Sequence, residues 1–414
     1  MHEAGNWVTA DELLVAGRAV AREGAGPLVC RSASVVDILV AAIAAERLGT
    51  GVTFVDPRLA LDTVGIEVGE QAAITAELGS EPVRENGFHF LSSGSTAAPT
   101  RVVRPAAVTL ADSRQIAGAV YAEPGDVALA TPCFHSYGFS HLAAALGRGR
   151  RVRVVRPNAT AAGLSALDGV EVFVGLPFHL DLVLAVGGRA AFTALRTVVS
   201  SAGRLSVETA DRAVAAGIPL RNAYGSTETG TIAIGEVAAV RDRAGFVGPS
   251  LDGVEVRLDE SGLLRVRTGA LAAGIIRDGR YVEIETEDGW HTTGDVAKAT
   301  EQGIWLLGRQ ADFLKVSGIR VSCARIRDMV LRHPAVSDVD VYGTSDRIRG
   351  EVAACRVVAA RPLPVADLRK WCHQHLNAEE VPRVIEFVDH IVRSATGKAM
   401  RVPAAIRSEE CAPK

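Results

Sequence analysis

The stretch Phe90-Leu-Ser-Ser-Gly-Ser-Thr-Ala-Ala-Pro99 is the most informative pattern in the chain. An apolar strand runs into a turn that is rich in small hydroxyl residues, and Pro99 follows the turn. Such a loop can present main-chain N–H groups and hydroxyls to phosphate oxygens. It is not a Walker A loop, because no Gly-Lys-Ser/Thr follows at the required spacing. Taken alone, it is equally typical of a plain Ser/Thr-rich turn.

A second loop, Asn222-Ala-Tyr-Gly-Ser-Thr-Glu-Thr-Gly230, places an aromatic residue, a hydroxyl and a carboxylate close together. Tyr224 could stack on a base, Thr227 could bond a phosphate, and Glu228 could hold Mg²⁺. The same pattern also fits an ordinary loop with a helix cap.

Two later segments carry groups that suit a sugar. They are Trp290-His-Thr-Thr-Gly-Asp295 and Gly308-Arg309-Gln-Ala-Asp-Phe-Leu-Lys315-Val-Ser-Gly318. Asp295 can accept hydrogen bonds from two ribose hydroxyls, and Arg309 can donate to the same sugar. A fifth segment, Arg393-Ser-Ala-Thr-Gly-Lys398, puts a Gly-Lys pair on a polar loop. In isolation, Thr-Gly-Asp is typical of a turn and Lys398 of a surface charge.

The surrounding pattern predicts an α/β protein. A capping box at Thr9 to Glu12 begins one helix, Ser34 caps another through Glu46, and Gly51 to Val55 is a buried strand. Short β-branched runs alternate with helical stretches at 152–155, 170–174 and 197–200, which indicates parallel strands in α/β layers.

The pattern of predicted helices and strands changes twice further along the chain. Short strands at 254–257, 263–267 and 280–284 predict a smaller β-rich subdomain over about 248–308. Helices expected at 326–332 and 365–377 and strands at 336–342 and 352–358 then predict an α+β domain. We therefore expect a large core at 1–308 and a small domain at 309–414.

Together, the five segments are far more specific than each one alone. In order and type they resemble the adenylate-forming superfamily, which includes acyl- and aryl-CoA synthetases, adenylation domains of nonribosomal peptide synthetases, and firefly luciferase. The resemblance covers residues 35–401, and it implies that 1–308 is the adenylation core and that 309–414 is a mobile domain. A sixth match, Thr131-Pro-Cys-Phe-His135-Ser-Tyr-Gly138, is similar to the Pro-x-Phe-His-x-x-Gly segment of acyl and aryl ligases.

The resemblance implies roles for specific positions. Those implied for the nucleotide are Ser92, Ser93, Gly94, Ser95 and Thr96 at the β- and γ-phosphates, Ser201, Ala202 and Gly203 at the adenine and acyl sites, Asn222 and Tyr224 at the base with Gly225 beside them, and Asp295 and Arg309 at the ribose. Those implied for chemistry are Thr227 at the α-phosphate, Glu228 at Mg²⁺, His135 at the acyl pocket and Lys398 between the carboxylate and the α-phosphate. Lys315 would face the tunnel for the thiol.

The activity implied by the resemblance is ATP-dependent activation of a small carboxylic acid as acyl-AMP, with release of pyrophosphate. The acyl group then passes to a thiol, either coenzyme A or the phosphopantetheine of an acyl carrier protein. His135 to Phe139 contains no Asp, where amino-acid-activating domains place one, so we expect an aryl, alkenoyl or short acyl acid.

The chain departs from the family pattern in several places, three of which concern the phosphate loop, the hinge and the acceptor. The usual Thr-Gly-x-Pro-Lys-Gly becomes Thr96-Ala-Ala-Pro-Thr-Arg101, so that Arg101 or Arg104 would replace the lysine charge. The hinge position holds Ala311, and Arg325 and Arg327 stand where acidic residues are usual. The last two changes leave room for a non-thiol acceptor such as an amine. A silent nucleotide-binding relative is the third possibility, against which the joint presence of Glu228, Asp295, Arg309 and Lys398 speaks.

Composition limits the other classes of function. The chain has 414 residues, 48% of them hydrophobic, and a net charge of −3, which does not favour nucleic acid or an acidic membrane as a partner. The six cysteines form no C-x-x-C pair, and no apolar run has the length of a membrane span, so we expect reduced thiols in a cytoplasmic protein without a membrane anchor.

Overall fold

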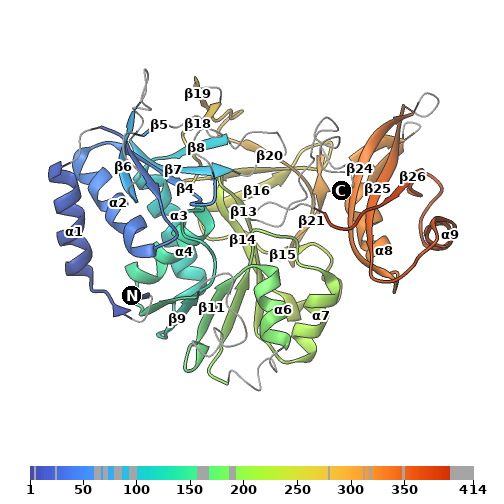
Figure 1. Ribbon diagram of the computed structural model, residues 1–414, viewed down its shortest axis with the longest axis horizontal. Coiled ribbons are helices and arrows are strands. Elements are labelled where there is room, and N and C mark those ends of the chain that lie inside the picture. Colours follow the sequence, from blue (N-terminus) through green and yellow to red (C-terminus); the bar gives the residue numbers. More distant parts are fainter. Residues whose placement is uncertain are drawn as a thin grey trace, which may run out of the picture. The chain divides into compact units, whose positions relative to one another are not determined.

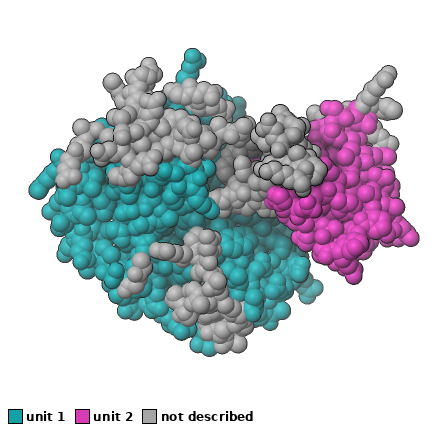
Figure 2. All heavy atoms as spheres, viewed as in Figure 1, with its two compact units in different colours: residues 1–293, 297–306 teal, residues 294–296, 307–414 magenta. Residues whose placement is uncertain are grey.

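The computed structural model divides the chain into two compact units (Figure 2). The first comprises residues 1–293 and 297–306, and the second comprises 294–296 and 307–414. The residues that the structure describes are 1–3, 6–23, 26–59, 67–68, 73–78, 86–92, 100–155, 167–185, 193–277, 280–310, 313–316, 319–346 and 350–391. Within these ranges, no helix is both long enough and apolar enough to cross a membrane.

The first sheet supplies a parallel array in the middle of the first unit (Figure 1). Its eight described strands lie in the order β14 (Gly230–Glu236), β13 (Leu220–Ser226), β12 (Thr197–Ser200), β11 (Val172–Gly175), β9 (Val127–Leu129), β10 (Val152–Val154), β1 (His2–Glu3) and β2 (Asn6–Trp7). The strands from β13 to β10 are all parallel, and β14 and β2 are antiparallel additions. The parallel strands predicted from the β-branched runs are therefore confirmed, with bounds shifted by up to two residues.

A second sheet of eight described strands is mixed. Its order is β19 (Arg280–Glu283), β18 (Gly274–Arg277), β8 (Thr100–Arg104), β7 (Gly87–Ser92), β4 (Gly51–Val55), β3 (Leu28–Arg31), β6 (Ile74–Leu78) and β5 (Glu67–Val68). The β18–β19 hairpin pairs with β8, Ile275 lying opposite Val102. The strand at 280–284 is predicted to belong to the β-rich subdomain, and this prediction is wrong, because β19 and β18 extend the sheet of β8. Local alternation identifies a strand but not its partner, which depends on contacts distant in sequence.

Helices cover these sheets. The described helices of the first unit are α1 (Ala10–Glu23), α2 (Val35–Leu48), α3 (Ala106–Val120), α4 (Ser136–Gly147), α6 (Pro177–Ala185), α7 (Val207–Ala215) and the 3₁₀ turn η4 (Val237–Ala239). The capping box is confirmed, since Thr9 N donates to Glu12 Oε2 at 2.7 Å and Glu12 N donates to Thr9 Oγ1 at 3.3 Å. Ser34 accepts from Asp37 N and caps α2. Reciprocal bonds of this kind satisfy donors that a helix start leaves open.

The core of the first unit joins both large sheets through α4. Phe139 of α4 packs against Phe54 of β4 and against Phe88 and Phe90 of β7, with ring centroids 5.0–5.6 Å apart. All four rings are buried. Burying such rings anchors α4 against the second sheet, and the start of α4 carries the His135 segment.

The smaller sheet has five described strands in the order β15 (Phe246–Gly248), β21 (Gly303–Arg309), β20 (His291–Thr300), β17 (Leu263–Thr268) and β16 (Val254–Leu258). The strands predicted at 254–257 and 263–267 are confirmed as β16 and β17, which pair antiparallel.

The second unit is an α+β domain with its own core. Its described strands are β22 (Phe313–Val316), β23 (Ile319–Ser322), β24 (Val336–Asp346), β25 (Gly350–Ala359) and β26 (Val384–Phe387), and its described helices are α8 (Cys323–Leu331) and α9 (Val365–His375). Residues of both helices and of β22 to β25 bury one apolar cluster. The α+β character predicted for this part is confirmed, whereas its mobility stays a prediction.

Candidate active site

The carboxyl ends of the parallel strands meet at one edge of the first sheet. Leu129 of β9 lies opposite Val174 of β11, and Val174 lies opposite Val199 of β12. The segments that leave this edge are 130–136, 176–179, 201–203 and 227–229. In open α/β sheets, ligands bind outside the carboxyl ends of the strands. Two of the sequence motifs, together with the implied positions 201–203, therefore lie at the edge where a ligand is expected.

The loop between β13 and β14 carries Thr227 and Glu228. Ser226 N donates to Thr229 Oγ1 at 3.2 Å and Thr229 N donates to Ser226 Oγ at 3.1 Å, so the turn is closed by its own hydroxyls. The register of the two strands shifts between Tyr224 and Gly225. Glycine is needed at this bulge, because a Cβ on Gly225 would collide with the carbonyl of Gly230. The side chains of Thr227 and Glu228 are half-buried.

The His135 segment approaches this loop from the start of α4. Ser136 is buried, and its Oγ donates to Thr227 Oγ1 at 3.4 Å. His135 is the residue before α4 and makes no side-chain cap. The structure thus brings the predicted acyl-side segment and the predicted phosphate-side loop together.

His135 is held as a neutral imidazole. Burial lowers its pKa to about 4, although Asp56 opposes the shift. Its Nε2 is buried and has no hydrogen-bond partner among the described residues. A neutral ring can donate or accept a hydrogen bond, but it cannot offer a cation to a carboxylate at neutral pH.

The segment after β12 lies beside β13. Ser201 is buried, its Oγ donates to the carbonyl of Ala223 at 2.7 Å, and its N–H donates to Gly175 O at 3.3 Å. Ala202 has a φ of 59°, a left-handed conformation that alanine rarely adopts. Such strained residues cluster at ligand sites. Gly203 follows and is exposed.

Asn222 and Tyr224 lie on β13 itself and are buried. Asn222 Nδ2 donates to the carbonyl of Phe246 at 2.7 Å, which ties β13 to β15. This bond leaves the amide oxygen of Asn222 as the group that could serve a ligand.

Asp295 and Arg309 form a pair in the second unit. Arg309 Nε lies 3.2 Å from Asp295 Oδ1, and the carboxylate is buried whereas the guanidinium is half exposed. The two groups predicted to hold the ribose therefore lie within reach of one small ligand.

Several predicted site residues cannot be placed. Ser93, Gly94, Ser95, Thr96, Ala311 and Lys398 lie outside the described residues, and for Lys315 only the main chain, in β22, is described. Ser92 is the last residue of β7, pairs with Thr100 of β8, and is half-buried.

The two arginines considered as replacements for the phosphate-loop lysine lie on β8 and are both buried. Arg104 is fully enclosed, and its Nη1 donates to the carbonyl of Thr227 at 2.7 Å. Asp112 of α3, a residue that the sequence does not predict for the site, lies 3.6 Å from Arg104 Nη2. The sequence pattern that could have identified Asp112 is a single carboxylate on a helix face that otherwise carries apolar or small residues.

Glu228 fits the expected role of a magnesium ligand. Its carboxylate forms no hydrogen bond or ion pair with any other described side chain, while its main-chain oxygen accepts from Ala272 N at 2.7 Å. Mg²⁺ is usually bound through one or two carboxylates together with substrate phosphates. A fixed backbone and a carboxylate without a hydrogen bond or close ion pair within the described part of the chain meet this requirement, while the buried cation of Arg104 attracts this carboxylate from a greater distance.

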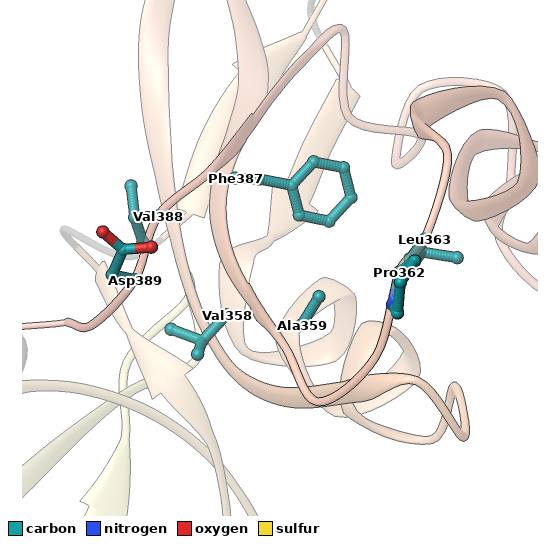
Figure 3. Close-up of a pocket in the computed structure, with 7 residues that line it drawn as sticks. All are labelled: Val358, Ala359, Pro362, Leu363, Phe387, Val388 and Asp389. Atoms are coloured by element: carbon teal, nitrogen blue, oxygen red, sulfur yellow. The ribbon is translucent and has the colours of Figure 1, made fainter.

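A hollow of about 380 Å³ in the second unit is separate from these groups (Figure 3). It lies at the ends of β25 and β26 and is lined mainly by apolar residues such as Val358, Leu363 and Phe387, with Asp389 as the one carboxylate of its lining. Among the described residues, none predicted to hold the nucleotide lines it.

Family profiles define the class of protein to which this architecture belongs. The profile of the AMP-binding enzyme family matches residues 34–276, and that of the AMP-binding enzyme C-terminal domain matches residues 326–398. The chain belongs to the AMP-binding enzyme family, and with it to the adenylate-forming superfamily. The predicted resemblance is confirmed.

Individual proteins of known name are similar to this chain in sequence. The 2-succinylbenzoate–CoA ligase of Bacillus cytotoxicus is 25% identical over 284 residues, which is 65% of this chain and 59% of the ligase. The corresponding ligase of Bacillus licheniformis is 27% identical over 199 residues, 44% of this chain and 41% of that protein. The chain thus spans about half the length of these curated relatives.

Solved structures share the fold. The o-succinylbenzoate CoA synthetase of Bacillus subtilis, in complex with its acyl-adenylate intermediate, has a TM-score of 0.81 and 19% identity over 96% of this chain and 93% of that one. The amide bond synthetase McbA of Marinactinospora thermotolerans has a TM-score of 0.79 and 22% identity over 96% and 94% of the two chains. The predicted fold class, a layered α/β core followed by a small α+β domain, is confirmed.

Proposed function

We propose that the protein activates a small carboxylic acid with ATP, forming an acyl-AMP and pyrophosphate, and transfers the acyl group to a thiol. The observation that carries the proposal is the contact of Ser136 with Thr227. It joins the segment expected to face the acid to the loop expected to face the α-phosphate. Membership in the AMP-binding enzyme family supports the use of ATP.

The chemistry requires one carboxylate oxygen to attack the α-phosphorus while the bond to pyrophosphate breaks. Negative charge approaches negative charge, so donors and cations fixed beforehand lower the barrier most. The Thr227 hydroxyl would donate to an α-phosphate oxygen, and Lys398 would neutralise charge between the acid and that phosphate. Glu228 would hold Mg²⁺, which supplies positive charge to the phosphates.

The acid pocket would be neutral and partly aromatic. His135 contacts Phe134, with ring centroids 4.7 Å apart, and burial keeps its imidazole uncharged at neutral pH. Phe139, four residues further along the same segment, is fully engaged in the aromatic core. These features favour an aryl or short acyl acid. The 2-succinylbenzoate–CoA ligases activate an aryl acid by their name, which agrees with this class.

The acceptor in the proposal is coenzyme A or a carrier-protein phosphopantetheine. An amine is the second candidate, because Arg325 and Arg327 stand where the family usually has acidic residues. Both are committed to ion pairs within the second unit, Arg325 with Glu380 at 2.9 Å and Arg327 with Asp340 at 3.8 Å. An amide bond synthetase is among the structural neighbours.

A pyrophosphate-exchange screen across aryl and alkyl acids tests the first half of the proposal. We expect Mg²⁺-dependent exchange with at least one aryl or short acyl acid. AMP release is then measured with that acid in the presence of coenzyme A, a phosphopantetheinylated carrier protein, or a panel of amines. AMP release that is stimulated by a thiol supports the proposal. AMP release that is stimulated only by amines would show that the acceptor is an amine and not a thiol. If no acid supports exchange while ATP still binds, adenylation itself is excluded.

A further inference from the structure

A buried arginine lies directly beneath the Thr227–Glu228 loop. Arg104 stands at the end of β8 and has no exposed surface. Its Nη1 donates to the carbonyl of Thr227 at 2.7 Å and lies 3.4 Å from the carbonyl of Glu228. One guanidinium nitrogen therefore grips two successive main-chain oxygens of the loop that carries the proposed phosphate and metal ligands.

Asp112 holds the other end of the same loop. Its Oδ1 accepts from the N–H of Thr231 at 2.9 Å, and its Oδ2 accepts from Ser140 Oγ of α4 at 2.7 Å. Gly230, at a φ of 70°, packs so closely that an added Cβ would lie 2.9 Å from Asp112 Cγ. Strand β8, helix α3 and helix α4 thus converge on both ends of a three-residue turn.

Stability alone does not account for this network. Burying a guanidinium and a carboxylate costs several kcal/mol per ion, and well-packed apolar side chains of similar volume are often as stable or more so. The pairing here is also incomplete, because Arg104 Nε is buried without a hydrogen-bond partner among the described residues. What an apolar pair could not provide is directional bonds to the main chain of the loop.

We propose that Arg104 and Asp112 are positioning residues, which clamp the main chain of residues 227–231 so that Thr227 and Glu228 project at a fixed angle toward the nucleotide. The catalytic consequence rests on the proposed function, whereas the clamp itself does not. Catalytic groups must be held to within about 0.5 Å of their productive geometry, and second-layer contacts to metal ligands are typically worth about 10–100-fold.

The chain offers a matched control in Arg150. Its Nη2 also donates to two successive main-chain carbonyls, those of Tyr121 and Ala122, at 2.9 and 3.3 Å. Its Nε is likewise buried without a partner among the described residues. Arg150→Met therefore removes an equivalent pair of bonds at the end of α3 rather than at the loop.

Three variants test the clamp. Arg104→Met removes the grip on the loop. The double variant Arg104→Met/Asp112→Asn removes both charges but keeps an oxygen for the Thr231 amide, so no unpaired buried charge threatens folding. Arg104→Lys keeps a cation opposite Asp112 but offers a single nitrogen in place of the planar guanidinium, whose Nη1 faces the loop and whose Nη2 faces Asp112. In ATP-free protein, we expect hydrogen exchange of a peptide covering 226–231 to be at least tenfold faster in the first two variants, intermediate in Arg104→Lys, and unchanged in Arg150→Met.

The kinetics of pyrophosphate exchange then test whether the clamp affects catalysis. We expect the kcat of pyrophosphate exchange to fall by about 10–100-fold in the double variant and the half-saturating Mg²⁺ concentration to rise, with the KM for the acid unchanged. A merely structural role would lower thermal stability without changing the Mg²⁺ requirement of the folded molecules.

The outcomes separate the two proposals. Unchanged hydrogen exchange at 226–231 overturns the clamp, whatever the activity. A loosened loop with unaltered kcat and Mg²⁺ dependence overturns the positioning role. If the parent protein catalyses no pyrophosphate exchange, but hydrogen exchange at 226–231 is faster in the Arg104 variants and not in Arg150→Met, the clamp is supported and the proposed function is wrong.

Discussion

Ser136 Oγ lies 3.4 Å from Thr227 Oγ1, although the two residues are 91 positions apart in the chain. Ser136 opens α4 and Thr227 tops the turn after β13. The hydroxyl of Thr227 accepts this hydrogen bond from Ser136. The proton of the Thr227 hydroxyl is therefore available for donation to another group. The pair therefore orients the one proton that the loop hydroxyl can donate, and a phosphate oxygen is the expected acceptor.

The hydroxyl of Thr227 should matter for catalysis and little for folding. Thr227→Val keeps the β-branched shape but removes the donor, and loss of one fixed donor typically costs about 10²–10³ in rate. We expect the rate of acyl-adenylate formation to fall by this amount, measured by pyrophosphate exchange, with an unchanged thermal midpoint. Thr227→Ser restores a hydroxyl and should retain most activity. Equal activity of the valine and serine variants would contradict the role.

Removing the negative charge of Glu228 should weaken magnesium-dependent steps specifically. Glu228→Gln preserves size, and the main-chain bonds that fix this residue do not involve its side chain. We expect kcat for pyrophosphate exchange to fall by about 10²-fold or more and the required Mg²⁺ concentration to rise.

The matched control for this change is Glu260→Gln, since Glu260 is an exposed carboxylate of the same unit. It should change neither kcat nor the Mg²⁺ dependence. A Glu228→Gln protein with the parent's Mg²⁺ titration would show that this carboxylate is not a metal ligand.

Lys398 is expected to act on the first half-reaction. Lys398→Ala should lower the single-turnover rate of acyl-adenylate formation by about 10²–10³-fold, because a fixed cation near the developing charge is lost, while the fold survives. Lys370→Ala, at an exposed position of α9, is the control and should be neutral. A parent-like single-turnover rate in Lys398→Ala would remove this residue from the mechanism.

Buried neutral histidines should make the protein sensitive to mild acid. Burial lowers the pKa of His135 to about 4 and that of His141 to about 3, whereas an unfolded histidine titrates near 6.5. At pH 7.5 and above, both are essentially neutral in either state, so their contribution to stability is fully present there. As the pH falls from 6.5 toward 4, only the unfolded state gains protons, and stability is lost.

Thermal unfolding at pH 7.5 and 5.0 measures this loss. For the fully buried His141, we expect about 2 kcal/mol less stability at the lower pH. His141→Gln removes the titrating group and should therefore show a smaller difference between the two pH values, even if it is less stable at both. An equal difference in parent and variant would show that His141 does not titrate in this way.

The motifs and the local starts of helices were readable from the sequence because they depend on neighbours a few residues apart. The Thr9–Glu12 capping box and the Ser34 cap formed as predicted. The loop of Thr227 and Glu228 was recognised because an aromatic, a glycine, a hydroxyl and a carboxylate occur together within it. The family, and with it the layered α/β core, follows from the order of such segments.

Contacts between distant segments had no local signal. The hairpin of β18 and β19 joined the second large sheet instead of the small one, because strand pairing is chosen by packing over the whole unit. The tie between Ser136 and Thr227 has the same origin.

The sequence by itself determined which chemical groups the protein carries and on which kind of element each one stands. The sequence suggests Arg104 as a replacement for the phosphate-loop lysine. Only the tertiary structure decided that its side chain is buried, where it donates to the main chain of Thr227 and lies beside Asp112. Periodicity reports whether a position is buried, but the direction of a buried charge is set by the polar partners that the packed sheets and helices bring to it.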